Sequence, residues 1–62
     1  MKNTIHIGRN KTNDLILNFQ QVSGNHAVIT PLAANSLIIE DIGSTNGTFV
    51  NGVQIKRKII NQ

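Results

Sequence analysis

The sequence predicts an all-β protein, a small sandwich of antiparallel strands, and two observations carry this prediction. Apolar residues recur at every second position in several short segments, as at Ile5 and Ile7, which is the spacing of a half-buried strand. Turn-forming residues separate these segments, and they include the pairs Asn46-Gly47 and Asn51-Gly52. No stretch between such breaks is long enough for a useful helix, so short strands joined by turns are the expected architecture.

The expected strands can be placed in order along the chain. Strand spacing is seen at 5–7, 15–17 and 27–29, and the longest apolar run, 37–39, predicts a central strand that ends at Glu40-Asp41. Turns are expected at 8–14, 23–25, 34–36, 43–47 and 51–52, where Gly, Asn, Asp and Ser gather. In total we expect about six strands of roughly five to seven residues.

Length and composition set limits on what the chain can do. Its 62 residues suffice for a single domain over 1–62, and at this size folding hides only about 60% of the surface, so a thin core is expected. There is no cysteine, which excludes disulfides and thiolate metal sites. The net charge of +3 favours an anionic partner. The basic cluster 56–58 is interpreted as a solvated strand or tail, and nucleic acid is not expected as a partner because two Phe are too few to stack bases.

Several function classes find no support in the sequence. Ser23 and His26 lack a third member for a catalytic triad, the histidines and acids show no metal-ligand spacing, and the Gly-rich segment 43–47 lacks the Gly-Lys-Ser/Thr ending of a nucleotide-binding loop. We therefore expect neither an enzyme nor a cofactor. No apolar run reaches the roughly 20 residues of a membrane span, and the N-terminus lacks a signal-peptide core; we expect a cytoplasmic protein without a membrane partner.

Three loops carry small polar residues that suit a phosphate. They contain Gly8-Arg9-Asn10, Ser23-Gly24-Asn25-His26 and 43–48. Arginine offers a planar fork that pairs with phosphate oxygens, while hydroxyls and loop N–H groups satisfy the remaining acceptors. The sequence therefore predicts a phosphate site if these loops lie side by side.

In order and spacing the three loops resemble the forkhead-associated (FHA) domain, a phosphothreonine-binding β-sandwich of the SMAD/FHA type. The matching residues extend from Ile5 to Ile55 and are Ile7-Gly8-Arg9, Asn13-Asp14-Leu15, Val22-Ser23, His26-Ala27, and Asp41-Ile42-Gly43-Ser44-Thr45-Asn46-Gly47-Thr48-Phe49-Val50-Asn51-Gly52.

The resemblance implies a role for each matching residue. Arg9 would pair with the phosphate, Ser23 would donate its hydroxyl to it, and Thr45 would contribute a hydroxyl or backbone contact. Asn46 would bond the peptide backbone beside the phosphothreonine. The residues implied to support the site structurally are Gly8, His26 and Gly47.

Two departures from the family pattern matter. The family usually carries Arg, Asn or Lys directly after the serine, where this chain has Gly24. Gly24 can offer only its N–H, and Lys11 would partly substitute. Losing one charge-assisted hydrogen bond, worth roughly 1.5–3 kcal/mol, would lower affinity tenfold or more. The strands that usually precede Ile5 and follow Ile55 are also missing, so the sandwich is expected to be incomplete at its termini, either as a truncated chain or as one completed by a neighbouring copy.

The sequence thus predicts a phosphothreonine-dependent protein interaction module. The alternative is an FHA-like scaffold that binds no phosphate and self-associates through uncovered strand edges, as a homo-oligomer, or packs on another domain. Two narrower alternatives stay open here. Arg9 would instead pair with Asp14 or Glu40, and Ser23 and Thr45 would be turn formers that bond their own backbone.

Overall fold

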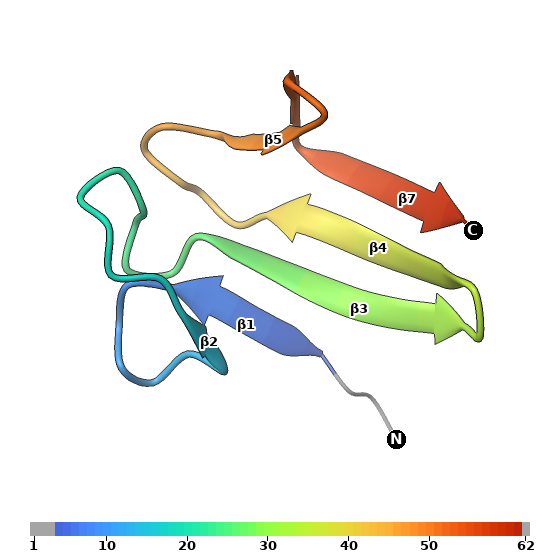
Figure 1. The fold of residues 1–62 in the computed structure, drawn as a ribbon, viewed down its shortest axis with the longest axis horizontal. Helices are drawn as coiled ribbons and strands as arrows, with labels where there is room; N and C mark the ends of the chain where they lie inside the picture. Colours follow the sequence, from blue (N-terminus) through green and yellow to red (C-terminus); the bar gives the residue numbers. More distant parts are fainter. Residues whose placement is uncertain (1–3, 62) are drawn as a thin grey trace.

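The computed structural model describes residues 4–61, and over this range every regular element is a β-strand. The strands are β1 (Ile5–Gly8), β2 (Leu15–Ile16), β3 (Ala27–Ala33), β4 (Ser36–Asp41), β5 (Thr48–Val50), β6 (Val53–Ile55) and β7 (Arg57–Asn61), shown in Figure 1. The all-β fold class is confirmed. Residues 4–61 contain no helix with the length and hydropathy needed to cross a membrane.

Five strands form one sheet in the order β2-β1-β3-β4-β7, and β5 and β6 form a separate hairpin. The long strands β3 and β4 lie in the middle, joined by a tight turn at Ala34-Asn35. The register shifts between Pro31 and Ala33, and β1 pairs with β3 only as far as Ile29. Pro31 has no N–H to donate, so it fits beyond the part of β3 that pairs with β1. The prediction of a central strand at 37–39 is confirmed.

Three details differ from the sequence-based expectation. Antiparallel pairing holds for β3 with β1, β4 with β3 and β7, and β5 with β6, but β1 and β2 run parallel. The turn after β1 brings the chain back alongside it, held by the His6 N–H to the Asp14 carboxylate (2.9 Å) and by the Leu17 N–H to the Gly8 carbonyl (2.9 Å).

The expected strand length of five to seven residues is wrong for the short strands. β1 has four residues, β2 has two, and β5 and β6 have three each. Residues 4–61 form seven strands, where about six were expected. Leu17 lies just outside β2, and the basic cluster begins the edge strand β7, where Arg57 and Lys58 are exposed. The interpretation of this cluster as a solvated strand therefore agrees with the structure.

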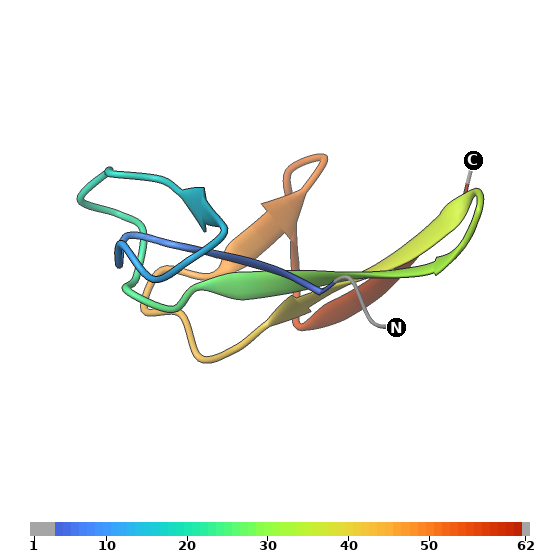
Figure 2. The same ribbon diagram turned by 90° about the horizontal axis from the view of Figure 1, so that it is seen from below.

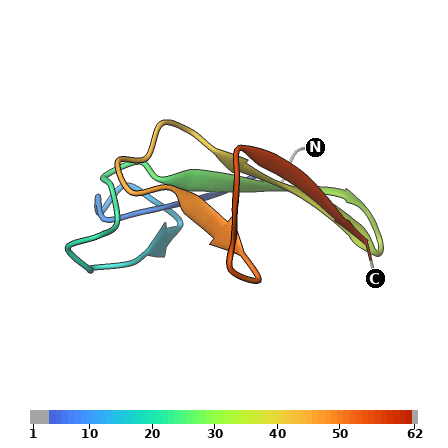
Figure 3. The same cartoon turned by 90° about the horizontal axis from the view of Figure 1, so that it is seen from above.

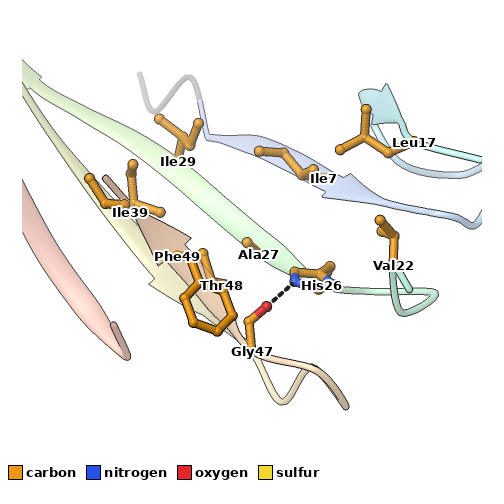
Figure 4. A pocket seen from close by; sticks show the side chains of 11 residues that line it. Ile7, Leu17, Val22, His26, Ala27, Ile29, Ile39, Gly47, Thr48 and Phe49 are labelled. Carbon is orange, nitrogen blue, oxygen red and sulfur yellow. Dashed lines mark hydrogen bonds between the residues drawn. The ribbon is translucent and has the colours of Figure 1, made fainter. Parts of the chain in front are cut away.

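The second layer of the sandwich covers only part of one sheet face. Seen edge-on, the end strand β2 and the β5–β6 hairpin rise on the same side of the sheet formed by β1, β3, β4 and β7 (Figures 2 and 3). Between them lies an apolar groove of about 280 Å³. Its lining comes from the sheet, the segment after β2 and the hairpin (Figure 4), and includes Ile7, Leu17, Val22, Ala27, Ile29, Ile39 and Phe49.

The core is thin, as the length predicts. Among residues 4–61 the buried apolar residues are Ala27, on the groove face, and Ile38, on the opposite face, whereas Phe49 remains 56% exposed. No large side chain in this range is fully buried. The fold therefore depends on backbone pairing and on hydrogen bonds between the loops more than on a packed interior.

The hairpin forms a closed excursion between β4 and β7. At its base the Asp41 N–H donates to the Lys56 carbonyl at 2.9 Å. At its tip Asn51 and Gly52 have φ values of 51° and 81°, the two positive values of a type I′ turn, which matches the twist of the paired strands. The Asn51-Gly52 turn expected from the sequence is confirmed.

Candidate functional site

The antiparallel order of β1, β3 and β4 brings three loops together at one end of the strands. β1 ends, β3 begins and β4 ends at this end, so the loops 9–14, 17–26 and 42–47 meet there (Figure 1). We call this group of loops the polar edge. It contains every residue that the sequence predicted for phosphopeptide binding.

The first two loops touch through backbone at Gly8 and Gly24. The Arg9 N–H donates to the Ser23 carbonyl (3.0 Å) and the Asn10 N–H to the Gly24 carbonyl (3.2 Å). A Cβ added to Gly8 would lie 2.2 Å from the Gly24 carbonyl oxygen, a distance that no side chain tolerates. Position 8 therefore requires glycine because another backbone occupies the space.

Asn13 and Asn10 hold the Gly24 segment in place. Asn13 is buried, and its Nδ2 donates to the carbonyls of Asn10 (3.0 Å) and Gly24 (2.7 Å). A Cβ on Gly24 would meet the Asn10 side chain at 2.8 Å. Asn10 thus occupies the volume into which a side chain at position 24 would extend.

His26 joins the second loop to the third. Its Nδ1 accepts the Ser23 N–H at 3.0 Å, and its Nε2 lies 2.9 Å from the Gly47 carbonyl, as Figure 4 shows. Because Nδ1 is an acceptor, the proton of the neutral ring is on Nε2 and is donated to Gly47. His26 has both ring nitrogens engaged in this link.

Ser23 and Thr45 are in direct contact. The Oγ of Ser23 accepts the Thr45 N–H at 2.9 Å. A serine hydroxyl has one proton to donate besides its acceptor sites, so Ser23 retains that donor for a ligand. The Thr45 N–H is already used, and any ligand contact from Thr45 falls to its exposed side chain.

Asp41 organises the third loop. Its carboxylate accepts the N–H groups of Gly43 (2.7 Å) and Ser44 (2.9 Å), the Ser44 hydroxyl, and the Thr48 hydroxyl (3.0 Å). The pKa of Asp41 lies well below the usual aspartate value. The largest cause is the hydrogen bond from the Ser44 hydroxyl, and the next is the bond from the Ser44 backbone N–H. The carboxylate is therefore ionised at neutral pH and joins the start of the loop, at Gly43 and Ser44, to Thr48 at its end.

The remaining candidate residues are exposed at the polar edge. Arg9 makes a long contact, 3.5 Å, with the Gln20 carbonyl, and Asn46 Nδ2 donates to the Gln21 carbonyl at 2.9 Å. Lys11 is exposed in the first loop.

The alternative partners proposed for Arg9 are engaged elsewhere. Within residues 4–61 Glu40 forms an ion pair with Arg57 at 3.8 Å, and Asp14 accepts the His6 N–H. No ion pair involves Arg9 in the described range. The guanidinium is thus available to a ligand.

Four residues have structural roles that the sequence did not predict: Asp41, Ser44, Asn13 and Asn10. Asp41 had a local signal, since a carboxylate that caps N–H groups two and three residues later is a common turn motif. Asn10 and Asn13 had no local signal for a contact with Gly24, because Gly24 is distant from both in sequence. In residues 4–61 no three His, Asp or Glu side chains are grouped to hold a metal ion.

Comparison with known proteins gives the family. The family model described as FHA domain matches residues 5–62. A protein phosphatase 1 regulatory inhibitor subunit PPP1R8 homolog from Arabidopsis thaliana is 40% identical over 42 residues, which are 68% of this chain and 11% of that protein. The chain therefore spans about a ninth of this curated relative.

Solved FHA structures have the same fold. The FHA domain of CT664 from Chlamydia trachomatis is 33% identical with a TM-score of 0.87, over 95% of this chain and 61% of that one. EmbR of Mycobacterium tuberculosis, solved with a low-affinity phosphopeptide, is 36% identical with a TM-score of 0.84, over 94% of this chain and 15% of that one. A third structure, from a study of phosphothreonine-dependent FHA domain interactions, is 28% identical with a TM-score of 0.82, over 92% of this chain and 58% of that one.

The match covers nearly all of residues 4–61, and it includes each of the three loops that form the polar edge. Together with the shared fold, it establishes that this chain belongs to the FHA domain family.

Proposed function

We propose that this chain is a phosphothreonine-dependent interaction module, which binds a phosphorylated protein at the polar edge and catalyses no reaction. The observation that carries the proposal is the convergence of Arg9, Ser23 and Thr45 at one end of the sheet. Similarity to EmbR, which was solved with a phosphopeptide, and to an FHA domain studied for phosphothreonine dependence supports it. A cytoplasmic location stays a prediction.

The chemistry of the free donors suits a phosphate dianion. Arg9 supplies a charged fork, and Ser23 retains its hydroxyl proton after accepting the Thr45 N–H. The Gly24 carbonyl is held by two donors, from Asn10 and Asn13, and the Gly24 N–H bonds to no acceptor within residues 4–61. The Arg, Asn or Lys side chain that the family usually carries after the serine is absent at Gly24, so we expect binding of reduced strength.

Asn46 gives the peptide a direction in this proposal. One proton of its amide is held by the Gln21 carbonyl, which fixes the side chain and leaves its oxygen and second proton for the ligand backbone. The bond also joins the loops 17–26 and 42–47, so Asn46 acts on site shape as well as on the ligand.

Titration of matched threonine, phosphoserine and phosphothreonine peptides tests the proposal. We expect binding to the phosphothreonine peptide alone, and loss of roughly tenfold or more in affinity on Arg9→Ala, because a charge-assisted bond is removed. Ser23→Ala and Asn46→Ala should cost less. Arg57→Ala is the matched control, since Arg57 is an exposed cation that pairs with Glu40 in the sheet rather than at the polar edge. Equal binding of the three peptides, or equal effects of the two arginine variants, would contradict the proposal.

A second candidate function has its own observation. The apolar groove lies between β2 and the hairpin and includes the exposed Phe49, and β7 is an edge strand. Such a surface suits self-association or packing on another domain. Light scattering over a range of concentrations separates the two, because a chain that stays monomeric and folded at high concentration has no need of this contact.

A further inference from the structure

The chain contains two Asn-Gly pairs, Asn46-Gly47 and Asn51-Gly52, whose chemistry is the same and whose surroundings differ. In such a pair the backbone nitrogen of the glycine attacks the asparagine Cγ, a new N–C bond closes a succinimide ring, and the side-chain nitrogen leaves as ammonia. Water then opens the ring to aspartate or isoaspartate. The reaction needs a mobile side chain and a glycine N–H that loses its proton.

The fold restrains both reacting groups of Asn46-Gly47. The Gly47 N–H donates to the Ser44 hydroxyl oxygen at 3.0 Å, and the Asn46 Nδ2 donates to the Gln21 carbonyl at 2.9 Å. The Gly47 carbonyl is held in addition by His26. Ring closure therefore requires that the nucleophile and the electrophile are both released from hydrogen bonds.

Asn51-Gly52 has no comparable restraint. Both residues are exposed at the tip of the hairpin, and within residues 4–61 the Asn51 side chain makes no hydrogen bond. A Cβ placed on Gly52 would meet no atom within 4 Å. The hairpin has only three residue pairs and belongs to no larger sheet, and such a hairpin opens locally at low cost.

We propose that Asn51-Gly52 is a site of spontaneous deamidation and that Ser44 and Gln21 protect Asn46-Gly47 from the same reaction. Conversion at position 51 adds a negative charge at the hairpin tip, away from the polar edge. Conversion at position 46 would replace an amide donor by a carboxylate beside the phosphate. The consequence for ligand binding rests on the proposed function, whereas the chemistry does not.

Peptide mapping by mass spectrometry tests this on the full chain. After incubation at mildly alkaline pH, the native chain should convert Asn51 roughly tenfold or more faster than Asn46, the ratio expected if two hydrogen bonds must break before ring closure. In concentrated urea the two sites should convert at similar rates, because both precede glycine. The readout uses no phosphopeptide, so its failure and that of the proposed function are distinguishable.

Ser44→Ala provides the decisive variant, and Ser36→Ala, at the far end of β4, is its matched control. Ser44→Ala should accelerate Asn46 and leave Asn51 unchanged, while Ser36→Ala should change neither. Loss of the whole fold would instead bring the two rates together, as urea does. Equal native rates at the two sites, or an Asn46 rate that Ser44→Ala does not raise in a folded chain, would overturn the proposal.

Discussion

At the scale of the residue, the space around Gly24 explains why this position carries no side chain. The Asn10 amide fills the volume that a Cβ at position 24 would approach, at 2.8 Å. The neighbour is the end of a flexible side chain rather than backbone, and Gly24 is not among the glycines with positive φ. A side chain at 24 therefore needs a shift of the flexible Asn10 side chain, whereas the backbone conformation of Gly24 would accept one.

This coupling predicts how the missing ligand contact can be restored. Gly24→Asn alone should not improve phosphopeptide affinity, because the new side chain displaces Asn10. Combined with Asn10→Ala, the same change should raise affinity several-fold, roughly the net value of about 1 kcal/mol for one hydrogen bond. Calorimetry on the two single variants and the double variant measures the coupling, and additive effects would contradict it.

Gly8 is a contrasting case, since its neighbour is a backbone carbonyl. Gly8→Ala should destabilise the fold by about 1–3 kcal/mol, the usual cost of overpacking, because the Gly24 carbonyl at 2.2 Å cannot move without breaking its bonds to Asn10 and Asn13. Urea unfolding measures the change. Gly43→Ala cannot serve as the control, because Gly43 has a φ of 97°. The matched control is Gly24→Ala in an Asn10→Ala background, which should cost less stability than Gly8→Ala.

At the scale of the element, the loop 42–47 owes its shape to one carboxylate. Asp41 accepts two backbone N–H groups and two hydroxyls. The Ser44 hydroxyl oxygen in turn accepts the Gly47 N–H, which extends the network to the end of the loop. Asp41→Asn should lower stability by about 1 kcal/mol after solvent screening is considered, and should weaken phosphopeptide binding by loosening Thr45 and Asn46. NMR signals of the Gly43 and Ser44 amides would show whether the loop has lost its fixed conformation.

The lowered pKa of Asp41 also sets a pH window. An aspartate whose folded pKa lies below its unfolded value of about 3.9 stabilises the fold at every pH above that value, and the contribution is lost as pH falls further, through the folded pKa. Loop order should therefore be constant between pH 5 and 7. Phosphopeptide affinity should nonetheless decline as pH falls from 7 to 5, because the phosphate loses its second negative charge near pH 6. Disorder of the Gly43 amide already at pH 5 would contradict this.

The elements were predictable to different degrees, and the reason lies in the range of the contacts. Alternating apolar residues and the Asn51-Gly52 pair act locally, so β1, β3, β4 and the hairpin turn follow from the sequence. The parallel pairing of β2 is accompanied by a hydrogen bond from the His6 N–H to the Asp14 carboxylate, a contact that periodicity does not reveal. At the polar edge, the family pattern located Arg9, Ser23, Thr45 and Asn46. It did not reveal that Ser23 already accepts the Thr45 N–H, or that Asn10 fills the space beside Gly24.

At the scale of the whole molecule, the open face of the sheet limits stability. Ile38 is 9% exposed, whereas the larger Phe49 is 56% exposed. Ile38→Ala should therefore cost about 2 kcal/mol or more, as for a buried aliphatic residue, and Phe49→Ala should cost less despite its size. Urea unfolding of the two variants tests the order. The reverse order would mean that the groove is covered in solution, by a second copy or another partner.

The hydrogen bond between Asp41 and Lys56 has a consequence for protein engineering. It closes the base of the excursion 42–55, so the positions where the chain leaves and rejoins the sheet are fixed independently of the hairpin tip. Lengthening a loop whose ends are already held costs little, since closure entropy grows only with the logarithm of length. The Asn51-Gly52 tip should therefore accept an inserted reporter segment. A reporter inserted there would lie on the same excursion, 42–55, that presents Thr45 and Asn46 to a ligand.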